Sequence, residues 1–252
     1  MSVYVQFHPW GRMGNRMFQY AFGYLLAQKK GTAFYAPELP NFNKLNTLTL
    51  LPSNFIKTSD YGNNYVDFNE LINTTKDIIV DSFVQKAHYY TPYITELRKL
   101  FNIKKDTIDD NHLALHIRET DYSSINCFLG YNFYKKIINE TKFTDVVIVT
   151  DNSKCATVQK LINDGCRLYT EGYVDKFEHF SNDRSMKDFN FLLHSKNIAI
   201  SQSSFSWWAA FLGNHKNIFF PYLTQGGMWK KNPEKDDINL FYYSKETHKL
   251  VL

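Results

Sequence analysis

The stretch LALHIRETDY, residues 113–122, runs from an apolar segment directly into charged side chains. Its first five residues, Leu113 to Ile117, are typical of a short buried strand. Alternation along a strand predicts that His116 and Arg118 lie on the same side. A guanidinium at the end of an apolar strand needs a partner or a ligand, and its planar fork fits phosphate oxygens. Asp121 is a candidate to hold Arg118 or His116 in position, although such close Arg and Asp residues also form ordinary surface ion pairs.

Downstream of this stretch, apolar runs alternate with amphipathic segments. We expect strands over 113–117, 146–150, 167–169, 197–200 and 217–220, and helices over 131–140, 153–163, 183–194 and 204–212. This alternation is typical of a parallel sheet that helices cover on both faces.

Upstream, the pattern predicts a second α/β segment. A strand over 3–7, a Gly-containing turn, an apolar helix over 16–29 and a strand over 32–36 form the unit with which a Rossmann-like half begins. Asn15 is expected to cap the helix and Gly31 to end it.

The segment that follows is harder to interpret. Residues 37–76 are expected to be irregular except for a short helix near 68–72, and a strand over 78–81 and a helix over 92–101 come next. The charged segment 104–111 is expected to be a linker.

Three further positions carry residue types suited to ligands. Gly14 and Asn15 begin the first helix, where backbone can approach a ligand closely, although a tight structural turn fits as well. Asp151 follows the strand 146–150 and is either a nucleoside contact or a helix N-cap. The third is a hydroxyl-rich helix start, a good phosphate cradle, where one serine would suffice for capping. Its residues are Ser201, Ser203, Ser204, Phe205 and Ser206, and the tryptophans that follow are more typical of a core.

Composition narrows the possible classes of function. The 252 residues are 44% hydrophobic and 21% charged, with a net charge of +4, so a folded core is expected and a nucleic-acid surface is not. The aromatic content of 17% fits a ring-rich core, or a groove for sugars or bases. Cys127, Cys155 and Cys166 have no spacing of a zinc site or a disulfide framework.

The chain also lacks several familiar signals. No apolar run approaches the roughly 20 residues of a membrane span, and no secretion signal opens the chain, so we expect a cytoplasmic protein with at most peripheral contact to membrane-linked glycans. No Asp-x-Asp pair follows a strand, so neither a metal nor a cofactor is expected. Charge on a leaving group would then be met by arginine and helix termini.

Three motifs together resemble the α-1,2-fucosyltransferase family. GRMGNRMFQYA (11–21) is similar to the opening Gly-Leu-Gly-Asn-Gln-Met-Phe-Gln-Tyr-Ala of that family. HIRETDY (116–122) is similar to its His-x-Arg-Arg-Gly-Asp-Tyr motif, which α-1,6- and protein O-fucosyltransferases share. SSFSWWAA (203–210) is similar to its Ser-Thr-Phe-Ser-Trp-Trp-Gly-Ala. With weaker likeness over 81–101 and 146–151, the resemblance covers most of the chain, and the order of the motifs makes it specific.

The resemblance implies an α/β fold of two Rossmann-like domains that face each other across a cleft, the GT-B architecture. A small acceptor-side domain would cover 1–105, and a domain that binds the nucleotide sugar would cover 106–252. The implied reaction moves L-fucose from GDP-fucose to a glycan hydroxyl, in an α-1,2 linkage, with inversion and without metal.

The resemblance also implies roles for individual residues. Arg118 would contact the β-phosphate of the donor, supported by His116 and Asp121, and Asp151 would lie near the nucleoside. The diphosphate and nucleoside would further contact Ser203, Ser204, Phe205 and Ser206. Gly14 and Asn15 would face the fucose.

Some residues depart from the family pattern. Glu119 replaces the second arginine of the motif, Thr120 replaces its glycine, and Arg16 replaces a glutamine. These changes leave two alternatives open, namely transfer of another nucleotide-linked deoxyhexose, or a carbohydrate-binding relative without turnover. The general base also stays open among Asp121, Glu119 and His8, or no strong base at all.

Overall fold

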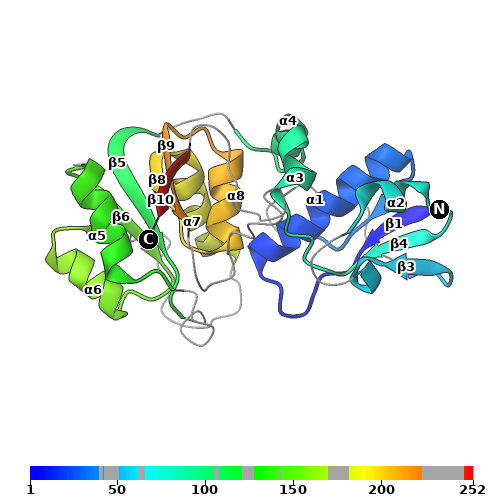
Figure 1. The fold of residues 1–252 in the computed structure, drawn as a ribbon, viewed down its shortest axis with the longest axis horizontal. Coiled ribbons are helices and arrows are strands. Elements are labelled where there is room, and N and C mark those ends of the chain that lie inside the picture. Colours follow the sequence, from blue (N-terminus) through cyan, green and yellow to red (C-terminus); the bar gives the residue numbers. More distant parts are fainter. Residues whose placement is uncertain are drawn as a thin grey trace. The chain divides into compact units, whose positions relative to one another are not determined.

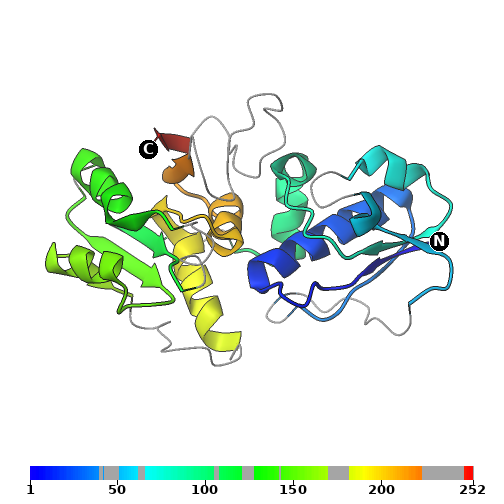
Figure 2. The same cartoon turned by 60° about the horizontal axis from the view of Figure 1, so that its bottom comes forward.

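The computed structural model shows an α/β protein with two parallel sheets, as the alternation of apolar runs predicted. The chain divides into two compact units, Met1–Ile103 and Lys104–Leu252, each with its own sheet and helices (Figures 1 and 2). The structure describes residues 1–39, 42, 51–61, 66–104, 108–120, 128–141, 143–169, 182–222 and 247–251. Over this part of the chain, no helix combines the length and the apolar character needed to cross a membrane.

The first unit contains a four-stranded sheet. Its strands lie in the order β2 (Ala33–Tyr35), β1 (Ser2–Val5), β4 (Asp77–Val80) and β3 (Phe55–Lys57), and all neighbouring pairs are parallel. The helices are α1 (Met13–Lys30), α2 (Phe68–Asn73), α3 (Ala87–Tyr90) and α4 (Ile94–Leu100), with 3₁₀ turns at Thr58–Tyr61 and Thr91–Tyr93. The sequence pattern missed β3, which is only three residues long and lies in the segment expected to be irregular.

Helix α1 begins earlier than predicted, and Asn15 is not its N-cap. The N-cap residue is Arg12, which makes no side-chain capping hydrogen bond. Asn15 lies in the first turn, where its Oδ1 accepts a hydrogen bond of 2.6 Å from Nε2 of Gln85. A tertiary contact therefore uses the side chain that local propensity assigned to capping. Gly31 does end the helix, in the left-handed conformation with φ 62°.

The second unit contains a six-stranded parallel sheet. Its strands lie in the order β10 (Thr247–Val251), β9 (Asn217–Tyr222), β8 (Ser195–Ala199), β5 (Ile108–Ile117), β6 (Val146–Thr150) and β7 (Arg167–Leu168). Its helices are α5 (Gly130–Thr141), α6 (Ala156–Asn163), α7 (Asn182–His194) and α8 (Ser204–Leu212). Starting from β5, the chain adds two strands on one side and then three on the other, which is the strand order of Rossmann folds.

Strand β5 corrects the predicted linker. It begins at Ile108, inside the charged segment 104–111, and Ile108 pairs with Ser195 of β8. Strand pairing uses backbone groups, so a polar segment can extend a strand beyond its apolar part. Strand β10 was not predicted, because it lies in a polar tail without clear alternation.

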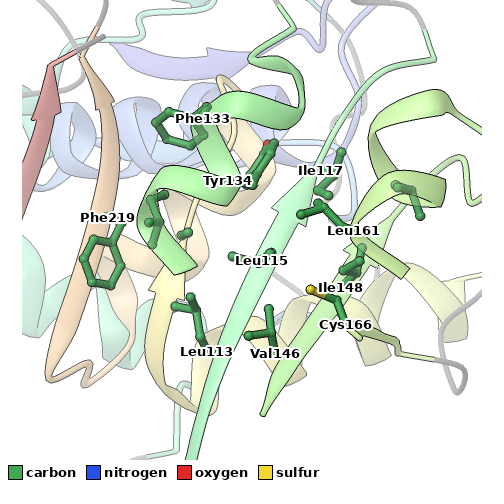
Figure 3. Packing of buried hydrophobic residues seen from close by; sticks show 13 residues of the cluster. Leu113, Leu115, Ile117, Phe133, Tyr134, Val146, Ile148, Leu161, Cys166 and Phe219 are labelled. Atoms are coloured by element: carbon green, nitrogen blue, oxygen red, sulfur yellow. The ribbon is translucent and has the colours of Figure 1, made fainter. Parts of the chain in front are cut away.

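The core of the second unit shows which way β5 faces. Leu113, Leu115 and Ile117 of β5 belong to one apolar cluster with Phe133 and Tyr134 of α5 (Figure 3). Because side chains alternate along a strand, the side chain of His116, between Leu115 and Ile117, is directed to the opposite face of the sheet. Leu113, Leu115 and Ile117 therefore face α5 and α6, and His116 is directed to the other face of the sheet near the end of the strand.

Candidate functional site

The candidate site lies where the order of strands reverses in the second sheet, between β5 and β8. Parallel pairing places Leu115 opposite Ala199 and Ile117 opposite Thr150, so the segments that follow β5, β6 and β8 emerge at one edge. Ligands of open α/β sheets bind at this carboxyl edge, at the point of reversal. We call the residues gathered there the switch-point cluster. It consists of His116, Arg118, Thr120, Asp151, Ser201 and Phe205.

His116 is the most buried ionisable member of the cluster. Its Nδ1 lies 2.7 Å from Oγ of Ser201, and its ring packs against Phe205 with 5.5 Å between centroids. The hydroxyl of Tyr134 donates a 2.9 Å hydrogen bond to the backbone oxygen of His116. Burial lowers the pKa of His116 to about 4, against the opposing effect of Asp151. The imidazole is therefore neutral at pH 7 and positions the start of the segment after β8.

Arg118 and Asp151 form the charged centre of the cluster. Nη1 of Arg118 lies 2.8 Å from Oδ2 of Asp151, and only 14% of the arginine side chain is exposed. The same carboxylate oxygen accepts a 2.6 Å hydrogen bond from Oγ1 of Thr120. Asp151 thus positions the guanidinium, and the role predicted for Asp121 stays a prediction, because Asp121 lies outside the described residues. Asp151 is not a helix N-cap either, because Cys155 occupies that position of α6.

Two further carboxyl groups lie in this neighbourhood. Burial, together with the negative charge of Asp151, raises the pKa of Asp188 on α7 to about 7. Within the described part of the chain, Oε1 of Glu119 is buried and accepts no hydrogen bond. Sequence reasoning missed Asp188, because nothing in the pattern of α7 distinguishes it from an acidic residue on a solvent-facing side.

The thiol of Cys155 explains where the Glu119 side chain lies. Its pKa is raised to about 12, mainly by burial and also by the nearby carboxylate of Glu119. The carboxylate of Glu119 is therefore directed toward the start of α6. Because His116 and Arg118 share one side of the strand, alternation also directs Glu119, which lies next to Arg118, to the opposite side.

The serine-rich segment has divided roles. Ser201 bonds to His116, whereas Ser203 is the N-cap residue of α8 and makes no side-chain capping bond. Oγ of Ser206 donates to the backbone oxygen of Ser203 at 3.3 Å. Ser204 and Phe205 are half-buried on the first turn of α8, where backbone N–H groups of a helix favour anions. The tryptophans that follow are in the core, as expected.

The other predicted site residues belong to the first unit. Gly14 is buried in the first turn of α1, and Asn15 is bonded to Gln85 as described above. Their contact with the sugar of a donor stays a prediction. In the described ranges of both units, His, Cys, Asp and Glu side chains form no group of three suited to a metal ion.

Comparison with known proteins gives likeness at the level of the fold. No protein-family model and no curated protein sequence matches the chain. Among solved structures, a mutant of Arabidopsis thaliana FUT1 in complex with GDP is similar over 93% of this chain and 72% of its own, with a TM-score of 0.52 and 13% identity. The fucosyltransferase NodZ from Bradyrhizobium is similar over 84% of this chain and 92% of its own, with a TM-score of 0.47 and 13% identity.

Proposed function

We propose that the chain is an inverting glycosyltransferase of GT-B architecture that moves L-fucose from GDP-fucose to a glycan hydroxyl, in an α-1,2 linkage and without metal. The single observation that carries the proposal is a mostly buried guanidinium, Arg118, at the carboxyl edge where the strand order reverses. Arg118 follows the end of β5, and the neighbouring strand β8 leads into the first turn of α8. Support also comes from the three sequence motifs and from the likeness in fold to a structure that contains GDP.

The donor diphosphate is the part of the substrate that this cluster suits best. Asp151 engages one guanidinium nitrogen of Arg118, and an arginine carries five N–H donors in a planar fork. The backbone N–H groups at the start of α8, beside Ser204, add positive partial charge. Asp151 at once holds the guanidinium in place and offers carboxylate oxygens to the nucleoside.

In the proposed reaction the protein forms no covalent bond to the substrate. The bond between C1 of fucose and the β-phosphate oxygen breaks, and its electron pair leaves with GDP. The acceptor oxygen forms a new bond to C1 from the opposite face, and its proton passes to a base or to water. Arg118 and the start of α8 stabilise the negative charge that grows on the diphosphate, and one such group placed in advance contributes about 3–4 kcal/mol. Neutral His116 keeps the segment after β8 in position.

A transfer assay with a panel of arginine variants tests the proposal. We expect Arg118→Ala to lower GDP release in the presence of acceptor by at least about 100-fold. Arg118→Lys keeps the charge but loses the fork, so it should also lower the rate strongly while keeping the fold. The matched control is Arg167→Ala, which removes an arginine from an exposed pair with Asp145 and should leave the rate unchanged. Full activity of Arg118→Ala would remove this residue from the mechanism.

The identity of the donor and the need for metal are tested separately. GDP-fucose, GDP-mannose, a nucleotide-linked rhamnose and UDP-glucose would each be added to the folded protein, because only a true donor stabilises it strongly. The largest rise in Tm is expected with GDP-fucose, and a larger rise with another nucleotide sugar would reassign the donor. Excess EDTA is expected to leave the transfer rate unchanged.

The acidic surroundings of the cluster favour one alternative specifically. Glu119 stands where the resembling family has a second arginine, and Oε1 of its carboxylate is buried without a hydrogen-bond partner among the described residues. If GDP-fucose stabilises the protein but is neither hydrolysed nor transferred, the chain is a carbohydrate-binding relative without turnover. If GDP raises the Tm of a Glu119→Gln variant more than it raises the Tm of the wild type, the negative charge of Glu119 weakens GDP binding.

A further inference from the structure

Trp10 is the most exposed large apolar side chain in the described part of the chain, with 83% of its surface accessible. It lies in the loop between β1 and α1, in the sequence His8-Pro9-Trp10-Gly11. Single exposed apolar residues are common on protein surfaces, so exposure alone means little. The contacts of this loop and its place in the fold make Trp10 unusual.

The loop that carries Trp10 is held on several sides. The N–H of Gly11 donates to the backbone oxygen of His8 at 2.8 Å, which closes a turn around Trp10, and the N–H of Trp10 donates to Nδ1 of His8 at 3.3 Å. The imidazole of His8 packs on Phe83, with 4.7 Å between ring centroids. Nε of Arg16 donates to the backbone oxygen of Gly11 at 2.9 Å.

Two further features fix the same loop to the body of the first unit. The buried amide of Gln19 accepts from the N–H of His8 at 3.1 Å and donates to the backbone oxygen of Gln6 at 3.0 Å. A Cβ on Gly11 would come within 3.0 Å of the His8 oxygen and 3.4 Å of Phe83, so the loop packs closely here. The indole is therefore presented to solvent by a turn with little freedom, and a ligand that contacts it orders little additional chain.

The loop also lies where parallel sheets bind ligands. It leaves the carboxyl end of β1, whose neighbours are β2 on one side and β4 on the other. Strand order reverses between β1 and β4, and Phe83, which packs against His8, follows β4. The first unit thus has a switch point of its own, and Trp10 stands at it.

We propose that Trp10 is a stacking platform for a pyranose ring of the acceptor glycan. This inference rests on the proposed glycosyltransferase function, and it adds the residue that positions the acceptor. The C–H face of a pyranose packs against an indole, while its hydroxyls need polar groups around the ring. Exposed Arg12 and half-buried His8 flank Trp10 and supply such groups. A sugar fits this combination, because its C–H face packs on the indole while its hydroxyls hydrogen-bond to polar side chains beside the ring.

Saturation-transfer NMR on the full chain tests the platform directly. The probe is methyl β-D-galactopyranoside, whose H3, H4 and H5 lie on one face, with glycerol as a polyol that has no ring face. We expect strong transfer to these three protons in the wild type and a loss of at least about fivefold in Trp10→Ala, with partial recovery in Trp10→Phe. The matched control is Leu51→Ala, which removes another exposed apolar side chain of the same unit and should leave the signal unchanged.

A kinetic arm uses the same variants. If the pyranoside accepts fucose, Trp10→Ala should raise its KM at least about fivefold, and the Tm shift caused by GDP should equal that of the wild type. Absent saturation transfer in the wild type, equal transfer in Trp10→Ala, or equal transfer to glycerol would each overturn the platform. Failure of the proposed function would give a different result, because GDP would then leave the Tm of the wild type unchanged. The saturation transfer to the galactoside would still test the role of Trp10 independently.

Discussion

The guanidinium of Arg118 and the carboxylate of Asp151 form a 2.8 Å ion pair between the ends of two neighbouring strands. Strands β5 and β6 are parallel, with Ile117 opposite Thr150, so the residues that follow each strand meet at one edge. Thr120 adds a hydrogen bond to the same carboxylate. The pair therefore joins the exits of two strands, and the arginine is held before any ligand arrives.

Breaking this pair should destabilise the second unit. Asp151→Asn keeps the shape of the side chain but removes the negative charge that lies 2.8 Å from a mostly buried guanidinium. We expect the free energy of unfolding to fall by about 1–3 kcal/mol, measured by urea denaturation at pH 7. The matched control is Asp145→Asn, which breaks the exposed pair with Arg167 and should cost less than about 1 kcal/mol. Equal losses in the two variants would contradict this interpretation.

His116 should make stability depend on pH. Its pKa in the folded protein, about 4, is below the ordinary value of 6.5, so protonation favours the unfolded chain. The resulting cost is absent above pH 6.5, grows as the pH falls, and reaches about 3 kcal/mol near pH 4. His116→Asn lacks this effect, so the stability advantage of the wild type over the variant should shrink from pH 7 to pH 4. A constant difference in urea midpoints over this range would count against a buried neutral imidazole.

Asp188 should make stability depend on pH in the opposite direction to His116. Its pKa in the folded protein, about 7, is above the ordinary value of 3.8, so the folded state binds a proton that the unfolded state has already released. Stability is therefore lost as the pH rises from about 4 through 7. Asp188→Asn removes this loss and should be more stable than the wild type by about 2 kcal/mol at pH 8, with little gain at pH 4.

Asp145 offers a contrast for the same titration series. Arg167 holds the pKa of the Asp145 carboxyl below its usual value, so its contribution is lost as the pH falls. Asp145→Asn should therefore differ from the wild type most at neutral pH and least in acid. If Asp188→Asn followed the pH course of Asp145→Asn, Asp188 would not be the raised carboxyl described here.

Gly23 should not accept a side chain. It lies on the buried side of α1, and an added Cβ would come within 2.6 Å of Val5 and 3.0 Å of Phe34. Gly23→Ala should destabilise the first unit by about 1–3 kcal/mol through overpacking, despite the better helix propensity of alanine. Gln28→Ala, on the exposed surface of the same helix, should change stability by less than about 0.5 kcal/mol. Thermal unfolding of the two variants would separate these outcomes.

The sequence by itself determined the elements and their class. Strand 146–150 and helix 204–212 have the predicted bounds, because a continuous β-branched run and an apolar segment that follows a serine-rich stretch are local signals. The long first helix was also predicted, and Gly31 ends it as expected. Short strands such as β3 and β10 were missed, since a few residues without alternation carry too little local preference.

Tertiary structure alone decided which side chains meet. The sequence suggested Asp121 as a partner of Arg118, and Asp121 lies outside the described residues; parallel pairing of β5 with β6 brings Asp151 to Arg118, which no local pattern indicated. Pairing of β5 with β8 likewise joined His116 to Ser201, and the approach of the segment after β4 took Asn15 away from helix capping. Local patterns encode helices and strands through neighbouring residues, whereas strand order and register depend on contacts between distant segments, and these set the partners in the site.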